Sequence, residues 1–122
     1  YQPQLSLADG SIRCVEALLR WNSAEHGEVS PVQFIPLAEE SGMIVGIGEW
    51  VLREACNTLA DWQRAGLAGL SMAVNVSATQ LLHSDLPRTV ERILRETGFG
   101  GRVVCGHTCS LRPTRIGERW DL

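Results

Sequence analysis

The feature that most constrains the fold is an amphipathic helical pattern that leads directly into a short β-rich run. Between Trp50 and Arg64, apolar residues recur at intervals of three and four, with charged residues mostly between them. This spacing is typical of a helix with one buried face. Gly66 ends the pattern, and residues 70–76 (Leu-Ser-Met-Ala-Val-Asn-Val) form an apolar run of strand length. A helix followed by a buried strand predicts an α/β fold.

The rest of the sequence extends this alternation of strands and helices. Residues 15–19 are so apolar that we expect both faces of their strand to be covered, as in α/β proteins. The order strand, strand, helix, helix, strand, helix favours a largely parallel sheet. In chain order, the remaining predictions are a strand at 1–7, a tight turn at Asp9-Gly10, a strand at 12–21, a polar loop at 22–28, a helix that starts at Ser30-Pro31 and is kinked or restarted at Pro36, and a helix at 86–97.

Composition excludes several classes of function. Of the 122 residues, 44% are hydrophobic and 20% are charged, as in ordinary globular domains. The net charge of −3 gives no general attraction to nucleic acid polymers or to anionic membranes. No apolar run approaches the roughly 20 residues that a membrane helix needs. Because the first residue is Tyr1, we expect the chain to be cut from a longer protein.

Of the four cysteines, Cys14 and Cys56 favour a reducing compartment, and we expect the chain to be cytoplasmic. Cys14 and Cys56 lie in apolar periodic segments, where small buried thiols are common. Cys105 and Cys109 flank His107 at a spacing loosely suited to zinc, but no second pair of ligands is near them in the sequence. Reduced, structural cysteines are therefore the main expectation.

Two polar residues interrupt the apolar strand segments. Glu16 lies within Val-Glu-Ala-Leu-Leu and Asn75 within Ala-Val-Asn-Val, both toward the C-terminal part of their strands. Functional sites of barrels and open α/β sheets assemble at that end, and carboxylate and amide oxygens suit a hard cation such as Mg²⁺. The alternatives are that Glu16 pairs with Arg20 or Arg13, and that Asn75 bonds to neighbouring backbone.

Arg20 and Gln2 are candidates for contacts with a ligand. Arg20 follows Glu16 by four residues, so the period of two places both on one face of the predicted strand. A guanidinium beside a metal-binding carboxylate suits a phosphate-bearing ligand, because its planar fork can hold two oxygens. A structural ion pair with Glu16 is the alternative for Arg20. Gln2 is on the adjacent strand, and its side chain either points toward the same site as Glu16 and Arg20 or is a solvated amide on an edge strand.

Several longer strings occur together and in a fixed order. The six segments are Tyr1-Gln2-Pro3-Gln4, Glu16-Ala17-Leu18 followed by Leu19-Arg20-Trp21, Ser30-Pro31, Phe34 to Gly42 (Phe-Ile-Pro-Leu-Ala-Glu-Glu-Ser-Gly), Ile47 to Leu52 (Ile-Gly-Glu-Trp-Val-Leu) and Val74-Asn75-Val76-Ser77. In this order and over about 100 residues, they specifically resemble the EAL domain of bacterial cyclic di-GMP phosphodiesterases.

The resemblance implies a fold, a reaction and a set of site residues. The family fold is a variant TIM-type (β/α) barrel whose first strand is antiparallel to the second, so this chain is expected to form roughly the first half of such a barrel. Members hydrolyse cyclic di-GMP to linear pGpG with Mg²⁺ or Mn²⁺. By position, Glu16 and Asn75 match metal ligands, Arg20 and Gln2 match nucleotide contacts, and Pro31 lies in a segment that lines the guanine pocket.

The sequence departs from the family pattern near its end. A strand with a Glu-[Leu/Ile]-Thr-Glu type motif is required near Val103, but Val-Val-Cys-Gly-His-Thr-Cys stands there. We therefore divide the chain into residues 1–101, an N-terminal part of an EAL domain, and a divergent tail at 102–122. A complete barrel takes about 250 residues, so about half of it is missing. A frameshift or early termination would explain the tail, and translating the other two reading frames tests that hypothesis.

The expected function is accordingly that of an incomplete phosphodiesterase segment. None of the acid and base residues of the family is present, so we expect no catalytic residues and no hydrolysis by this chain. The alternatives are a non-catalytic cyclic di-GMP-binding or protein-interaction module, and a truncated product without function. A GGDEF or sensor domain could precede the segment in the parent protein, as in many relatives.

Overall fold

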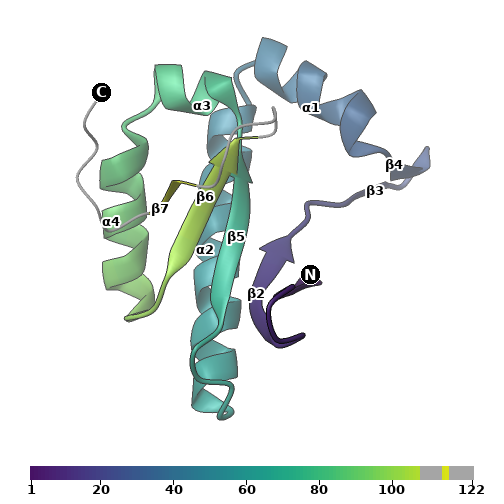
Figure 1. Cartoon of the computed structure of the whole chain (residues 1–122). Helices are drawn as coiled ribbons and strands as arrows, with labels where there is room; N and C mark the ends of the chain where they lie inside the picture. The colour runs from purple at the N-terminus through teal and green to yellow at the C-terminus, as the bar shows by residue number, and fades with distance from the viewer. Residues whose placement is uncertain (108–113, 116–122) are drawn as a thin grey trace.

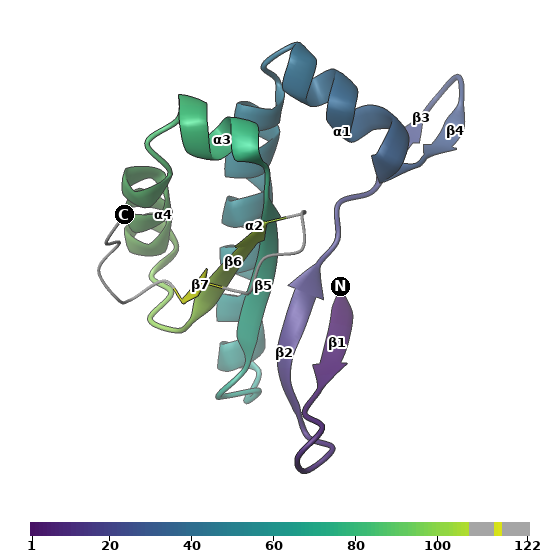
Figure 2. The same ribbon diagram turned by 45° about the horizontal axis from the view of Figure 1, so that its top comes forward.

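The core of the structure is a mixed five-stranded sheet. The computed structural model describes residues 1–107 and 114–115. The strand order is β1-β2-β5-β6-β7, in which β2, β5 and β6 are parallel and the two edge strands are antiparallel to their neighbours (Figures 1 and 2). The antiparallel first strand and the α/β class agree with the prediction. The strands are β1 (Gln2–Leu5), β2 (Ile12–Ala17), β5 (Ser71–Val76), β6 (Val103–His107) and β7 (Thr114–Arg115).

Two helices cover one face of this sheet. The helix α2 (Ile44–Arg64) packs on β5 and on α4 (Leu86–Thr97), and both helices lie on the same side of the strands (Figure 1). The most deeply buried side chains lie between these layers, and they include Leu52, Leu59 and Ile93. Among the described residues the core is therefore one-sided.

The opposite face of the sheet is open in the part of the chain that the structure describes. Val15 and Ala17 are buried whereas Glu16 between them is only half-buried, and Asn75 is exposed between buried valines. The prediction that both faces of β2 are covered is thus wrong for these residues. The apolar run conceals an alternation with a period of two, in which the polar residues occupy the uncovered side.

A second small sheet replaces the predicted polar loop. The first long strand ends at Ala17 rather than Trp21, and β3 (Trp21–Ser23) then pairs with β4 (Gly27–Val29). The Ser23 hydroxyl accepts bonds from two backbone amides of the turn, and Gly27 has a φ of +66°, a left-handed conformation that favours glycine. Polar composition concealed this hairpin, because its single apolar pair, Trp21 and Val29, is separated along the chain by mostly polar residues.

The helical segments differ from prediction mainly in their bounds. The helix α1 (Pro31–Glu40) is not restarted at Pro36. The carbonyl that loses its partner there belongs to Val32, which is 83% exposed, so water can bond to it. The helix α2 begins six residues before the expected Trp50, at Ile44, and α4 matches the prediction.

The short helix α3 (Ala78–His83) was not predicted, although Ser77 and Gln80 have the spacing of a capping box. No helix in the described residues is long and apolar enough to cross a membrane.

Candidate functional site

Glu16 and Asn75 meet on the open face of the sheet. Each is the penultimate residue of its strand, and β2 and β5 run parallel with Glu16 paired to Ala73. Asn75 lies two residues further along β5 on the same face, and its Nδ2 donates a hydrogen bond to Glu16 Oε1 at 2.8 Å. The alternative partners expected from the sequence, an arginine for Glu16 and neighbouring backbone for Asn75, are not the ones that these side chains bond to in the described residues.

The two arginines near Glu16 bond elsewhere. Arg13 forms an ion pair with Asp9 at 2.6 Å across the first turn. Arg20 Nη1 donates to the Leu19 carbonyl at 3.0 Å. Within the described residues Glu16 is therefore held by amides and not by a guanidinium. An amide partner leaves the carboxylate charge uncompensated, which favours a cation at this position.

Strand β1 adds two glutamines to the same face. Gln2 stands opposite Glu16 in the antiparallel register, and directly opposed residues share a face. Gln4 Nε2 donates to Glu16 Oε2 at 3.4 Å, so both carboxylate oxygens receive a bond. Gln4 was missed by sequence reasoning, since this diagonal contact depends on the register of β1 and β2.

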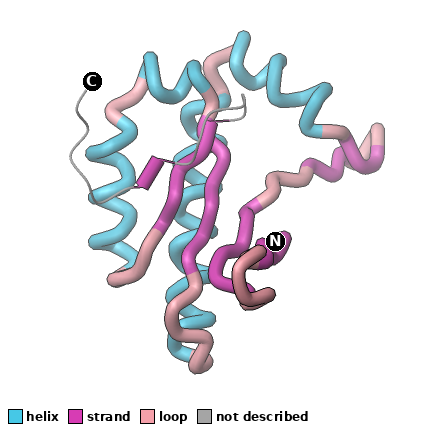
Figure 3. Tube along the Cα trace, in the orientation of Figure 1, coloured by secondary structure: helices cyan, strands magenta, loops and turns pink. Residues whose placement is uncertain are grey.

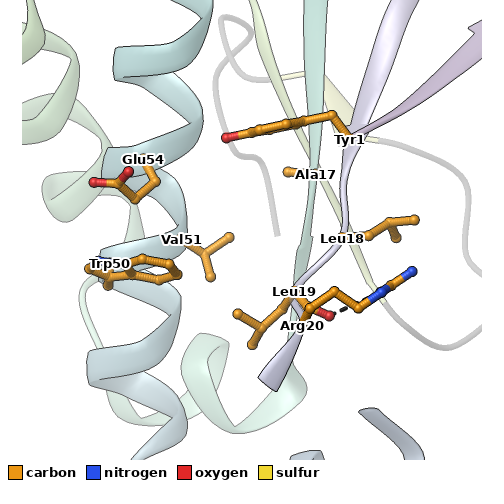
Figure 4. Close-up of a pocket in the computed structure, with 8 residues that line it drawn as sticks. All are labelled: Tyr1, Ala17, Leu18, Leu19, Arg20, Trp50, Val51 and Glu54. Atoms are coloured by element: carbon orange, nitrogen blue, oxygen red, sulfur yellow. Dashed lines mark hydrogen bonds between the residues drawn. The ribbon is translucent and has the colours of Figure 1, made fainter. Parts of the chain in front are cut away.

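Arg20 lies in a loop and not on β2. Residues 18–20 connect the end of β2 to β3, so the prediction that a strand places Arg20 on the face of Glu16 is wrong (Figure 3). In Figure 4 the Arg20 side chain extends to the opposite side of the backbone from Trp50 and Val51 of α2. Its guanidinium is bound to one backbone carbonyl, and no other described residue bonds to it, so with respect to that part of the chain its remaining donors can serve a ligand.

Arg20, Pro31 and Asn75 line one cavity of about 130 Å³ at the C-terminal ends of the parallel strands. The cavity is bordered by α1, the first turns of α2, and Ser77 and Gln80 at the start of α3. Glu16 and Gln2 are outside it, on the adjoining open face of the sheet. The candidate ligand contacts thus occupy two adjoining surfaces, with Asn75 common to both.

Two further hollows adjoin Arg20. One, of about 190 Å³, lies between the N-terminus and α2 and is lined by Tyr1, Trp50 and Glu54 among others (Figure 4). The other, of about 530 Å³, lies between α1 and α2, and Arg20 is the only charged residue among the described ones that line it. Neither hollow includes Glu16 or Asn75, so both are separate from the polar site.

The donor atoms at Glu16 and Asn75 fit a hard divalent cation. Rotation of the Asn75 amide exchanges Nδ2 with Oδ1 and would place an amide oxygen beside the carboxylate. Mg²⁺ and Mn²⁺ favour such oxygen ligands. The described residues contain no group of three or more His, Cys, Asp or Glu side chains placed to hold a metal, so the two residues would form part of a larger ligand set.

The cysteines show no sign of a metal site in the described region. Cys56 and Cys105 are buried and Cys14 is half-buried, and all three are free thiols. Burial raises the pKa of Cys56 to about 11 and that of Cys105 to about 12. The predicted burial is confirmed for Cys56 but not for Cys14. Cys109 and the side chain of His107, which the zinc alternative requires, lie outside the described residues.

The chain matches a known protein family over most of its length. Residues 1–105 match the EAL domain family. Over 94 residues, 77% of this chain, it is 48% identical to the bifunctional diguanylate cyclase/cyclic di-GMP phosphodiesterase MucR of Pseudomonas aeruginosa. Over 99 residues, 81% of this chain, it is 40% identical to the cyclic di-GMP phosphodiesterase PdeR of Escherichia coli.

The structure has a counterpart among solved proteins. It superposes on the PaMucR phosphodiesterase, solved as a cyclic di-GMP complex, with a TM-score of 0.77 and 45% identity over 81% of this chain and 40% of that chain. The chain spans only 14% of the MucR sequence and 15% of PdeR. The family match and the shared fold lead to one conclusion: this chain belongs to the EAL-domain family.

Proposed function

We propose that residues 1–105 are the first half of a cyclic di-GMP phosphodiesterase domain and supply one corner of its metal and nucleotide site. Glu16 and Asn75 hold Mg²⁺ or Mn²⁺, while Gln2, Arg20 and Pro31 face the nucleotide. The observation that carries the proposal is the 2.8 Å contact between Asn75 Nδ2 and Glu16 Oε1 at the C-terminal ends of two parallel strands. The family match and the solved MucR complex support the choice of cyclic di-GMP.

Each residue has a role that its chemistry allows. The Glu16 carboxylate supplies negative charge, and Asn75 supplies a neutral oxygen once its amide has turned. Arg20 exchanges its bond to the Leu19 carbonyl for two bonds to phosphate oxygens, which its planar guanidinium favours. A divalent ion held by this corner would offset phosphate charge and orient the substrate for in-line displacement.

In the 122-residue chain, we expect the residues around Glu16 and Asn75 to bind cyclic di-GMP more readily than they hydrolyse it. The described residues bring one carboxylate and one carboxamide to the metal position, whereas Mg²⁺ gives up its water reluctantly and binds such a small set weakly. This observation favours a second candidate function, a non-catalytic cyclic di-GMP-binding module. We expect calorimetry to detect cyclic di-GMP binding without any release of pGpG. Steady pGpG release by the purified chain would contradict the incomplete site, and absence of binding would favour a product without function.

A chimera tests the proposed roles directly. Residues 1–105 would replace the matching segment of the MucR EAL domain, so that the remaining half supplies the rest of the site. We expect the chimera to hydrolyse cyclic di-GMP and Glu16→Gln to lower kcat/KM by more than about 100-fold, since even outer partners of metal ligands cost about 10–100-fold.

The matched control is Glu28→Gln, an exposed carboxylate in β4 of the small hairpin. This variant should keep full activity if the loss in Glu16→Gln comes from the metal-binding role of Glu16. Equal activity of both glutamine variants would overturn the assignment of Glu16.

The surroundings of the segment are part of the same proposal. Cyclic di-GMP is a bacterial second messenger made and degraded inside cells, so we place the chain in the cytoplasm. The bifunctional name of MucR supports a GGDEF or sensor domain in the parent protein. The nucleotide sequence upstream of the segment tests this arrangement.

A further inference from the structure

Gly48 and Gln80 are packed so closely that position 48 admits a side chain only if the Gln80 side chain moves. A Cβ atom at Gly48 would lie 1.7 Å from Gln80 Nε2 and 2.4 Å from Gln80 Cδ. Gly48 lies inside α2 and does not have a positive φ, so its backbone conformation is open to any residue. Glycine in a helix interior is destabilising relative to alanine. Close approach of the Gln80 side chain is therefore the physical reason for glycine at this position.

Gln80 is fixed on its other side by the start of α3. Its Oε1 accepts a hydrogen bond from the Ser77 backbone amide at 3.1 Å, and Ser77 Oγ accepts one from the Gln80 backbone amide at 3.2 Å. Only 4% of Gln80 and 5% of Ser77 is exposed. Because a carboxamide that is both buried and hydrogen-bonded has reduced freedom, Gln80 is held between Gly48 of α2 and the N-terminus of α3.

This connection lies two residues from Asn75. Strand β5 ends at Val76 and α3 begins at Ala78, so the capping box at Ser77 determines where and in which direction the chain leaves the sheet. Gly48, Asn75, Ser77 and Gln80 all line the cavity of about 130 Å³. Displacement of Gln80 would therefore be transmitted to Asn75 through a single short turn.

We propose that Gly48 and Gln80 act as positioning residues that hold Asn75 against Glu16. Neither is a catalytic residue, since each acts through the turn after β5. The inference rests on the proposed function for its significance, because it assigns these residues to the orientation of a metal ligand. The contact that they maintain, Asn75 Nδ2 to Glu16 Oε1, can be measured without any metal.

The first experiment compares variants of the 122-residue chain by nuclear Overhauser effects between the Asn75 side-chain amide protons and the Glu16 γ protons. Gly48→Ala should abolish these signals. The control is Gly46→Ala in the same helix, where an added Cβ meets nothing within 4 Å, and it should keep them. The double variant Gly48→Ala/Gln80→Ala removes the steric conflict and should recover thermal stability relative to Gly48→Ala. It should still lack the signals, because the bond from the Ser77 backbone amide to Gln80 Oε1, one half of the capping box, is gone.

The second experiment adds Mn²⁺ and follows paramagnetic broadening of the Asn75 amide together with Mn²⁺ affinity. Affinity should fall about 10-fold in Gly48→Ala and in the double variant, as expected for outer partners of a metal site. Overhauser signals retained in the double variant would overturn the positioning role, whatever Mn²⁺ does. If those signals behave as expected but Mn²⁺ leaves wild-type Asn75 unaffected, the positioning contact stands and the proposed metal site fails.

Discussion

The two faces of the central sheet are stabilised in different ways. The covered face is apolar, with Leu59 and Ile93 fully buried, and its rim is closed by ion pairs between α2 and α4. The open face carries Glu16 and Asn75, whose partners are other polar side chains. Stability and ligand chemistry are therefore divided between the two sides of the same strands. Substitutions on one face should therefore affect stability, and those on the other should affect binding.

The largest expected effect compares one truncation on each face. Leu59→Ala removes a side chain with 0% exposure and should lower the free energy of unfolding by about 2–5 kcal/mol. Asn75→Ala removes an exposed hydrogen bond and should cost less than about 1.5 kcal/mol. Urea denaturation of both variants measures the contrast. The division between faces breaks down if Asn75→Ala is as destabilising as Leu59→Ala.

The three cysteines that the structure describes provide a second comparison, because they lie on both faces. Cys14 shares the open face with Glu16, whereas Cys56 and Cys105 belong to the core. Burial raises the pKa of Cys56 from 9.0 to about 11, so its thiolate population at pH 8 should be about 100-fold lower than for an unshifted thiol. Mass spectrometry of iodoacetamide-treated protein should therefore find Cys14 labelled before Cys56 and Cys105. Early labelling of Cys56 or Cys105 would show that the covered face opens.

The smallest expected effect concerns the charged rim. Hydrogen bonds from Arg92 and Arg53 are the main causes that lower the pKa of Glu49 and of Glu96, respectively, below the usual 4.5. A carboxylate with a lowered folded pKa stabilises the fold above its unfolded pKa, and that contribution is lost as the pH falls through the folded pKa.

The Tm should therefore decrease as the pH is lowered below 4.5, the usual value for these carboxylates, and Arg92→Gln should reduce the decrease. Arg95→Gln, which breaks an exposed pair with Glu91, is the control and should follow the wild-type profile. Identical pH profiles for the two variants would remove any special role for the α2–α4 rim.

Part of the site could be predicted because it depends on local rules. Strand periodicity and the shared end of parallel strands are enough to bring Glu16 and Asn75 to one face. Arg20 could not be placed in this way, since nothing in the apolar run signals that β2 ends at Ala17. The contact of Gln4 with Glu16 could not be predicted either, because it depends on the register of β1 on β2, which contains an irregularity.

The helices and strands also divide into those that local sequence patterns predict and those that they do not. Strong helical periodicity predicted α4 with its bounds, while the hairpin of β3 and β4 has too few apolar residues to be distinguished from a loop. The capping box at Ser77 and Gln80 was readable and would have predicted α3. The close approach of Gln80 to Gly48 was not readable, because it joins residues from separate helices.

Shared coordination of one divalent cation by Glu16 and Asn75 can be observed by anomalous diffraction from crystals of the chimeric domain grown with Mn²⁺. We expect a manganese peak about 2.0–2.2 Å from a Glu16 carboxylate oxygen and from Asn75 Oδ1. A peak coordinated by other side chains, with either residue out of reach of the ion, would contradict it.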